Sequence, residues 1–152
     1  MTATNGRERD WSGTAAPSLD EIANLAQFAF EALPVQFRDL CGELIIQVED
    51  FPDDEAMEEL GCESPFDLLG LFRGIGIAQG SVTQPSTDPN MVFLYRRPIL
   101  DYWAEHEEML GAVVTHVLVH EIGHHFGLSD ADMERIEREA DVDPAPSQRT
   151  VQ

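Results

Sequence analysis

A helical apolar run that ends in a cluster of histidines constrains the fold more than any other part of the chain. The segment Val117–Asp130 reads VLVHEIGHHFGLSD. His120 and His124 are four residues apart, so on a helix of 3.6 residues per turn they lie one above the other on the same face. Two imidazoles in this arrangement can bind one metal ion. The apolar residues around them predict that the helix is buried and that the rest of the chain packs around it.

The residues beside the histidine pair extend the metal-binding pattern. Glu121 directly follows the first histidine, where its carboxylate can accept a proton from a water molecule that a metal activates. Gly127 comes three residues after His124, and a glycine there can adopt the left-handed conformation that ends a helix. The chain can then turn back, and Asp130 is the next residue with metal-binding chemistry. The complete pattern is H-E-x-x-H-x-x-G-x-x-D.

The third metal ligand is less constrained than the histidine pair. We predict Asp130, because it follows the glycine turn most closely, and Asp132 and Glu134 are the alternatives. A second interpretation of Asp130 is an acidic residue that stabilises the first turn of the next helix. His116 lies on the same helix face, but three imidazoles spread over about 12 Å cannot all bind one zinc ion. We therefore interpret His116 as a surface residue or a residue outside the coordination shell.

Charge and composition narrow the range of partners. The 152 residues carry a net charge of −20, and the chain has arginine but no lysine. Such a surface repels nucleic acids and anionic membranes, so we expect neither as a partner. Residues 1–16 lack the apolar core of a signal peptide, and we expect a cytoplasmic monomer. Cys41 and Cys62 lie in no metal-binding pattern and are predicted to be free thiols, with a disulfide as the alternative.

Hydrophobic periodicity predicts alternating helices and strands in a single domain. A capping box at Ser18–Glu21 predicts a helix that ends at Pro34, and a Pro-containing linker is expected to follow. The other predicted elements are a strand at Glu43–Asp50, a partly helical acidic segment at Phe51–Glu63 with Met57 and Leu60 against the core, a second strand at Met91–Arg96, a helix from about Tyr102–Glu105 to Phe126, and a helix at Asp132–Ala140 capped by Ser129. Residues 1–16 and 141–152 are predicted to be loosely attached, leaving 17–140 as the domain.

The order of these motifs resembles a small bacterial family of minimal zincin-like metallopeptidases. The resemblance covers about Leu19–Ile136 and is strongest at Val119–Asp130. It also includes Leu33-Pro34, Phe37-Arg38, Ile45–Glu49 with Asp50-Phe51-Pro52-Asp53, Leu69-Gly70-Leu71 and Phe93–Pro98. The glycine spacing is similar to that of the metzincins, which usually have histidine where this chain has Asp130. They also have a methionine turn further downstream than Met133.

The resemblance implies an α+β fold with a small mixed sheet packed against an N-terminal helix and the HExxH helix. It also implies Zn²⁺ bound by His120, His124 and Asp130, and Glu121 as the base in the hydrolysis of a peptide or protein substrate. The alternative is a zincin-fold module that binds a metal or a protein and cleaves little. The small size favours such a module, whereas Glu121 favours an enzyme, because a structural metal site needs no base. A peptide substrate is expected to add to an exposed strand edge, with Met91–Arg96 as one candidate.

Overall fold

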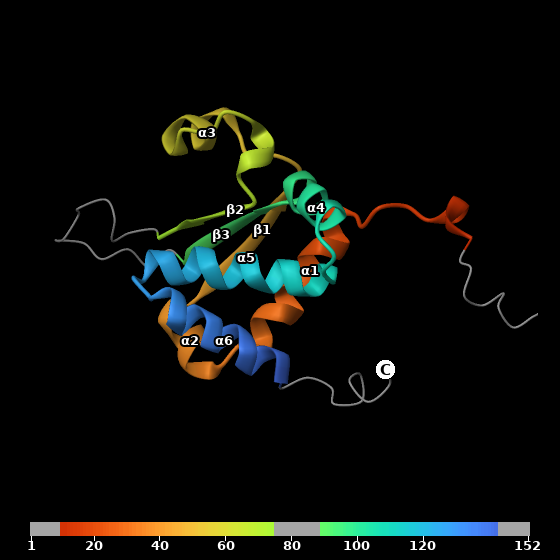
Figure 1. Cartoon of the computed structure of the whole chain (residues 1–152). Coiled ribbons are helices and arrows are strands. Elements are labelled where there is room, and N and C mark those ends of the chain that lie inside the picture. The colour runs from red at the N-terminus through yellow and green to blue at the C-terminus, as the bar shows by residue number, and fades with distance from the viewer. Residues whose placement is uncertain (1–9, 75–88, 143–152) are drawn as a thin grey trace, which may run out of the picture.

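The computed structural model describes residues 10–74 and 89–142, and their strands form one three-stranded mixed sheet (Figure 1). The strands are β1 (Leu44–Glu49), β2 (Gly70–Arg73) and β3 (Asn90–Tyr95), in the order β1-β3-β2. β3 pairs in parallel with β1 and antiparallel with β2. The prediction of Met91–Arg96 as an exposed edge is therefore wrong, because both sides of β3 already carry strand partners. The sheet edge beside the HExxH helix is β2.

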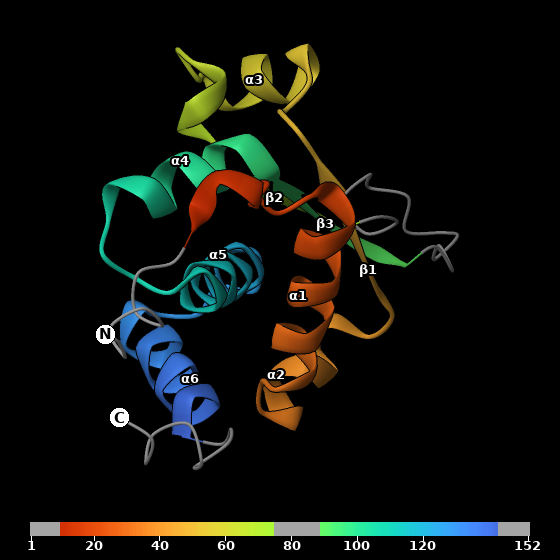
Figure 2. The same ribbon diagram turned by 90° about the vertical axis from the view of Figure 1, so that its right-hand side faces the viewer.

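Two helices cover one face of the sheet. α1 (Leu19–Glu31) lies next to β1, and α5 (Leu110–His125) lies beside it under β2 and β3 (Figure 2). Alternate residues of β3, Val92 and Leu94, point to these helices and are fully buried. The opposite sheet face is more open, and Ile45 on β1 is 42% exposed there. This arrangement confirms the predicted α+β fold, with a mixed sheet packed on an N-terminal helix and the HExxH helix.

The HExxH helix α5 is the central element of the core. It contacts α1, the sheet, α4 (Arg96–Glu105) and α6 (Asp130–Val142). A helix with neighbours on several sides must be apolar on more than one stripe. The buried residues of α5 are Val113, Val114, Val117, Leu118, Val119, Ile122 and Gly123. The surrounding elements thus fix the position of the helix that carries the histidines.

The predicted start of α1 and the predicted thiols are confirmed. The Ser18 side chain accepts a hydrogen bond from the Glu21 backbone N–H, and Glu21 accepts one from the Ser18 N–H. Both cysteines are free. Cys41 is 1% exposed, and burial raises the pKa of its thiol to about 11.

Two predicted boundaries are wrong. The expected linker after Pro34 contains a helix, α2 (Val35–Cys41), because Phe37 and Cys41 are one helical turn apart and both face the core. The expected single helix to Phe126 is two helices, α4 and α5, separated by residues 106–109. α4 begins at Arg96 despite Pro98, because a proline in the first turn of a helix removes no helical hydrogen bond.

The acidic segment forms a small unit above the sheet. Its helix α3 (Asp54–Leu60) is capped by Asp53, and the short helix η3 (Pro65–Asp67) follows. Leu60 is exposed and Ala56 is the buried residue, so the expected core contact of Leu60 is wrong. Near the start of the described chain, η2 (Trp11–Gly13) stands away from the other elements (Figure 1). None of the helices in residues 10–74 and 89–142 is long and apolar enough to cross a bilayer.

Candidate metal centre

His120 and Glu121 are adjacent in sequence but face different parts of the structure. Successive residues on a helix point about 100° apart. His120 faces α6, where its Nε2 lies 3.2 Å from a carboxylate oxygen of Glu137. Glu121 faces the edge strand β2 at Gly70. His120 and Glu121 therefore lie on two different sides of α5, near its C-terminal end.

Gly70 allows β2 to lie close to the HExxH helix. A β-carbon at this position would lie 2.8 Å from Val117 Cγ1 and 3.3 Å from Glu121 Cγ. The first distance is below van der Waals contact, so only glycine fits without a shift of strand or helix. Partial burial of the Glu121 side chain raises its pKa to about 7. The structure therefore places a half-buried carboxyl group with a near-neutral pKa beside the sheet edge.

His120 and His124 are neighbours on α5, as predicted from their spacing. Their ring centroids are 5.6 Å apart, and the rings are nearly perpendicular. Burial, and next the positive charge that a protonated His116 would carry, lower the pKa of His120. A neutral imidazole is the form that binds a metal. His125 lies outside this group, because its ring packs 4.2 Å from that of Phe72 on β2.

The turn after the histidines has the geometry expected from Gly127. Its φ is +75°, and its N–H donates to the carbonyl of His124. The N–H of Leu128 donates to the carbonyl of Gly123, which completes a Schellman motif. The glycine is thus a backbone requirement that reverses the chain from α5 into α6.

We expect Gly127→Val to lower the free energy of unfolding by about 1–2 kcal/mol, because a β-carbon is strained at positive φ. We also expect it to weaken zinc binding, since α6 starts three residues later. Gly61 is the matched control, because it has φ +66° at the end of α3 and, like Gly127, open space where a β-carbon would go. Gly61→Val should lose similar stability in denaturant titrations but keep its zinc affinity. Equal zinc affinities for the two variants would show that the turn does not position a ligand.

The first turn of α6 holds two of the three acids proposed as the third ligand. Ser129 caps the helix, since its Oγ accepts the Asp132 N–H, and Asp132 in turn accepts the Ser129 N–H. Asp132 also pairs with Arg135 at 3.2 Å, and its hydrogen bonds to Ser129 are the main cause of its lowered pKa. Asp132 is therefore engaged as a capping residue. Asp130 and Glu134 are exposed, and Asp130 stays the predicted ligand.

The carboxylate that lies against His120 is Glu137, which our sequence interpretation did not include. Among the described residues, one group of metal-binding side chains has its donor atoms within 4.8 Å of one another, and its members are His116, His120 and Glu137. The sequence feature that could have identified Glu137 is the chain reversal near Leu128, which returns α6 along α5. An antiparallel pairing of α5 and α6 that sets Met133 against Gly123 also brings Glu137, one turn later, opposite His120.

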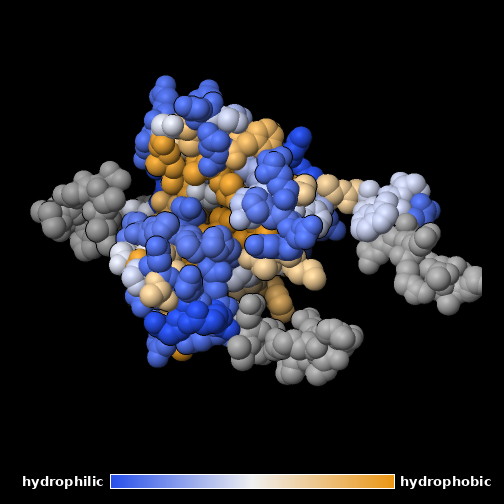
Figure 3. Space-filling view, viewed as in Figure 1, coloured by the Kyte–Doolittle hydropathy of each residue, from blue (hydrophilic) through white to orange (hydrophobic). Residues whose placement is uncertain are grey.

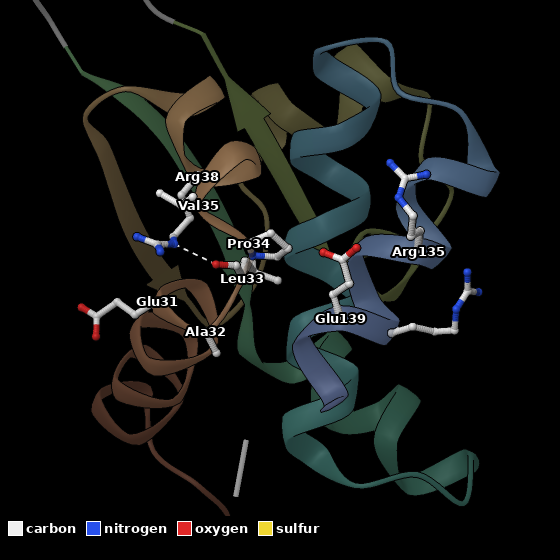
Figure 4. A pocket seen from close by; sticks show the side chains of 9 residues that line it. Glu31, Ala32, Leu33, Pro34, Val35, Arg38, Arg135 and Glu139 are labelled. Atoms are coloured by element: carbon white, nitrogen blue, oxygen red, sulfur yellow. Dashed lines mark hydrogen bonds between the residues drawn. The ribbon is translucent and has the colours of Figure 1, made fainter. Parts of the chain in front are cut away.

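The donor types at this end of α5, imidazole nitrogens and carboxylate oxygens, are those that zinc binds, although the donor atoms of His120, His124 and Asp130 do not all lie within 4.8 Å of one another. Zinc takes nitrogen and oxygen ligands of this kind and leaves a position open in catalytic sites. His120 and His124 would supply the helical pair, and an acid from α6 would supply oxygen. A groove of the described structure lies elsewhere. It has a volume of about 650 Å³, lies between α2 and α6, and has Arg38, Arg135 and Arg138 along it (Figure 4).

A buried HExxH helix under a small mixed sheet, with the glutamate at a sheet edge, defines a metallopeptidase-like fold. The comparison with family models agrees. Residues 41–140 match the model of the zincin-like metallopeptidases, and the chain belongs to this family. The match begins at Cys41 in α2 and ends at Ala140 in α6, so it includes the whole sheet and both helices of the candidate site. Comparison with curated proteins finds no match.

Proposed function

We propose that this protein is a zinc-dependent peptidase that hydrolyses a peptide or protein substrate. The observation that carries the proposal is the position of Glu121. It lies on the same helix as the histidine pair, is partly buried, and faces an edge strand to which a peptide can add. A purely structural metal site would need neither the acid nor the strand edge. Membership of the zincin-like metallopeptidase family supports the same function.

His120 and His124 would hold the zinc ion, with Asp130 as the predicted third ligand. When bound, zinc increases the acidity of water and polarises a carbonyl group. Glu121 accepts the proton of the attacking water and then donates a proton to the leaving amine. The positive charge of a bound zinc ion would lower the pKa of Glu121 again, so that it would start the reaction as a carboxylate. The partial burial of this side chain limits competition from bulk water.

The substrate is proposed to lie along β2. Within the described residues, β3 is the only strand paired with β2, and extended peptides bind by adding to the edge of a sheet. An apolar area lies between α3 and α5 on the face shown in Figure 3, over the position of β2 in Figure 1. Such a surface suits the apolar side chains of a peptide. Arg73 at the end of β2 is held by Glu59 of α3 at 3.0 Å, which connects the acidic unit to this edge.

The proposal is tested by metal analysis and cleavage of a peptide library with the same preparation. The zinc-loaded protein should contain about one zinc per chain and cleave a subset of peptides. Removal of zinc with a chelator should stop cleavage, and added zinc should restore it. A zinc-loaded protein that cleaves no peptide in the library would favour the alternative, a metal- or protein-binding module with a zincin fold.

A further inference from the structure

Three histidines on α5 form two overlapping pairs. His116, His120 and His124 are at positions i, i+4 and i+8, so each neighbouring pair has the spacing that can bind one metal ion. The ring centroids of His116 and His120 are 3.9 Å apart, closer than the 5.6 Å between His120 and His124. His116 and His120, the N-terminal pair, are therefore closer together than the pair within HExxH.

Glu137 supplies an oxygen to the N-terminal pair. One of its carboxylate oxygens lies 3.1 Å from His116 Nδ1 and 3.2 Å from His120 Nε2. Two ligand atoms bound to a tetrahedral zinc at about 2.05 Å are about 3.3 Å apart. The separations between the nitrogens and the oxygen are thus close to those of a coordinated zinc ion. An ion pair between partly exposed groups contributes little stability, so stability alone does not explain why two imidazoles share one carboxylate.

We propose that His116, His120 and Glu137 form a second coordination set for a divalent first-row transition metal. The set shares His120 with the HExxH pair. A metal held by this set would take His120 Nε2, the nitrogen that faces Glu137 on α6, and His124 is not a member of this group of donor atoms. The two sets are therefore alternatives, and the chain binds one ion in one set or the other. The proposal concerns metal binding and does not require hydrolysis.

The test measures Zn²⁺ affinity by competition with a chromophoric chelator in His124→Ala, which retains only the second set. We expect His124→Ala to bind zinc within about tenfold of the wild type. Combining His124→Ala with Glu137→Gln or with His116→Ala should weaken zinc binding by more than about 100-fold. This loss is larger than the loss of about 10- to 100-fold expected for a residue that supports a ligand without binding the metal. His120→Ala should lose both sets in one step. Co²⁺ absorption in His124→Ala should show tetrahedral coordination that disappears in the double variants.

Control variants separate ligand loss from general effects. Glu139→Gln, an exposed acid on the same helix as Glu137, and His106→Ala, whose ring stacks on Tyr102, should leave zinc affinity unchanged in the His124→Ala background. Thermal unfolding checks that each variant is folded. The proposal is overturned if His124→Ala binds zinc as weakly as His120→Ala. It is also overturned if Glu137→Gln alone weakens zinc binding by more than about 100-fold, which would make Glu137 a ligand of the HExxH pair. Neither result would by itself exclude peptide hydrolysis.

Discussion

Glu121→Gln is expected to lower peptide hydrolysis by roughly 10²–10⁴-fold while leaving zinc content unchanged. Glutamine has nearly the same shape as glutamate, so it should fit between α5 and β2 at Gly70 without moving His120 or His124. It cannot accept a proton from the attacking water. The measurement is zinc stoichiometry and turnover on the same preparations. Unchanged turnover would show that the observed hydrolysis uses another base or comes from a contaminant.

The same substitution should stabilise the metal-free protein at neutral and alkaline pH. The pKa of Glu121 is raised from its ordinary value of 4.5 to about 7, so the folded chain binds this proton more tightly than the unfolded chain does. Stability contributed by the protonated group is complete below about pH 4.5 and is lost as the pH rises through 7. Metal-free Glu121→Gln should therefore unfold with a free energy on the order of 1–3 kcal/mol above wild type at pH 8. At pH 4 the free energies of unfolding of the metal-free variant and the metal-free wild type should be nearly equal.

A second large effect is expected at Gly123, inside the HExxH motif. A β-carbon there would lie 2.5 Å from Met133 Sδ and 2.9 Å from Met133 Cγ, and Met133 is fully buried. Gly123→Ala should therefore lower the free energy of unfolding by about 1–3 kcal/mol through overpacking. It should also reduce zinc affinity, because a displaced α6 carries its acids away from α5. Denaturant titration and zinc competition measure the two effects.

Gly111 on the same helix is the matched control for Gly123. The nearest atom to a β-carbon at Gly111 is Leu25 Cδ1 at 3.9 Å, an ordinary contact. Gly111→Ala should be neutral or slightly stabilising, because alanine favours a helix over glycine. Combining Gly123→Ala with Met133→Ala should cost less than the sum of the single changes, since the removed side chain frees the space that the new methyl needs. Additive losses would show that the contact with Met133 is not the cause.

The parts of the structure that sequence predicted best are those fixed by local chemistry. The capping box at Ser18, the glycine turn at Gly127 and the Ser129 cap depend on hydrogen bonds within a few residues. The apolar spacing around His120 and His124 likewise predicted a buried helix. The geometry of such short-range patterns is set by the few residues within them, so they can be interpreted without knowing how the elements pack.

The elements that sequence did not predict depend on contacts between distant segments. The pattern of Met91–Arg96 identifies a strand but does not show that both of its neighbours are strands. α2 was missed because the proline before it suggested a linker, whereas its helix is stabilised by burial of Phe37 and Cys41. Glu137 was missed because it has no motif of its own. Its importance follows only from the way α6 packs on α5 at Gly123 and Met133.

The order of strands in the sheet has a consequence for the order in which the parts of the proposed site form during folding. β1 pairs with β3 across a long stretch of chain, and α1 packs on α5 from the opposite end of the sequence. Pairings between such distant segments form slowly, because each must first close a long loop. The α5–α6 hairpin, in contrast, is local and contains every proposed metal ligand. We therefore expect the histidines and α6 acids to come together early, and Glu121 to become desolvated only when β2 docks on α5 through Gly70. A nascent chain would then be able to capture a metal before Glu121, the proposed base, reaches its partly buried position.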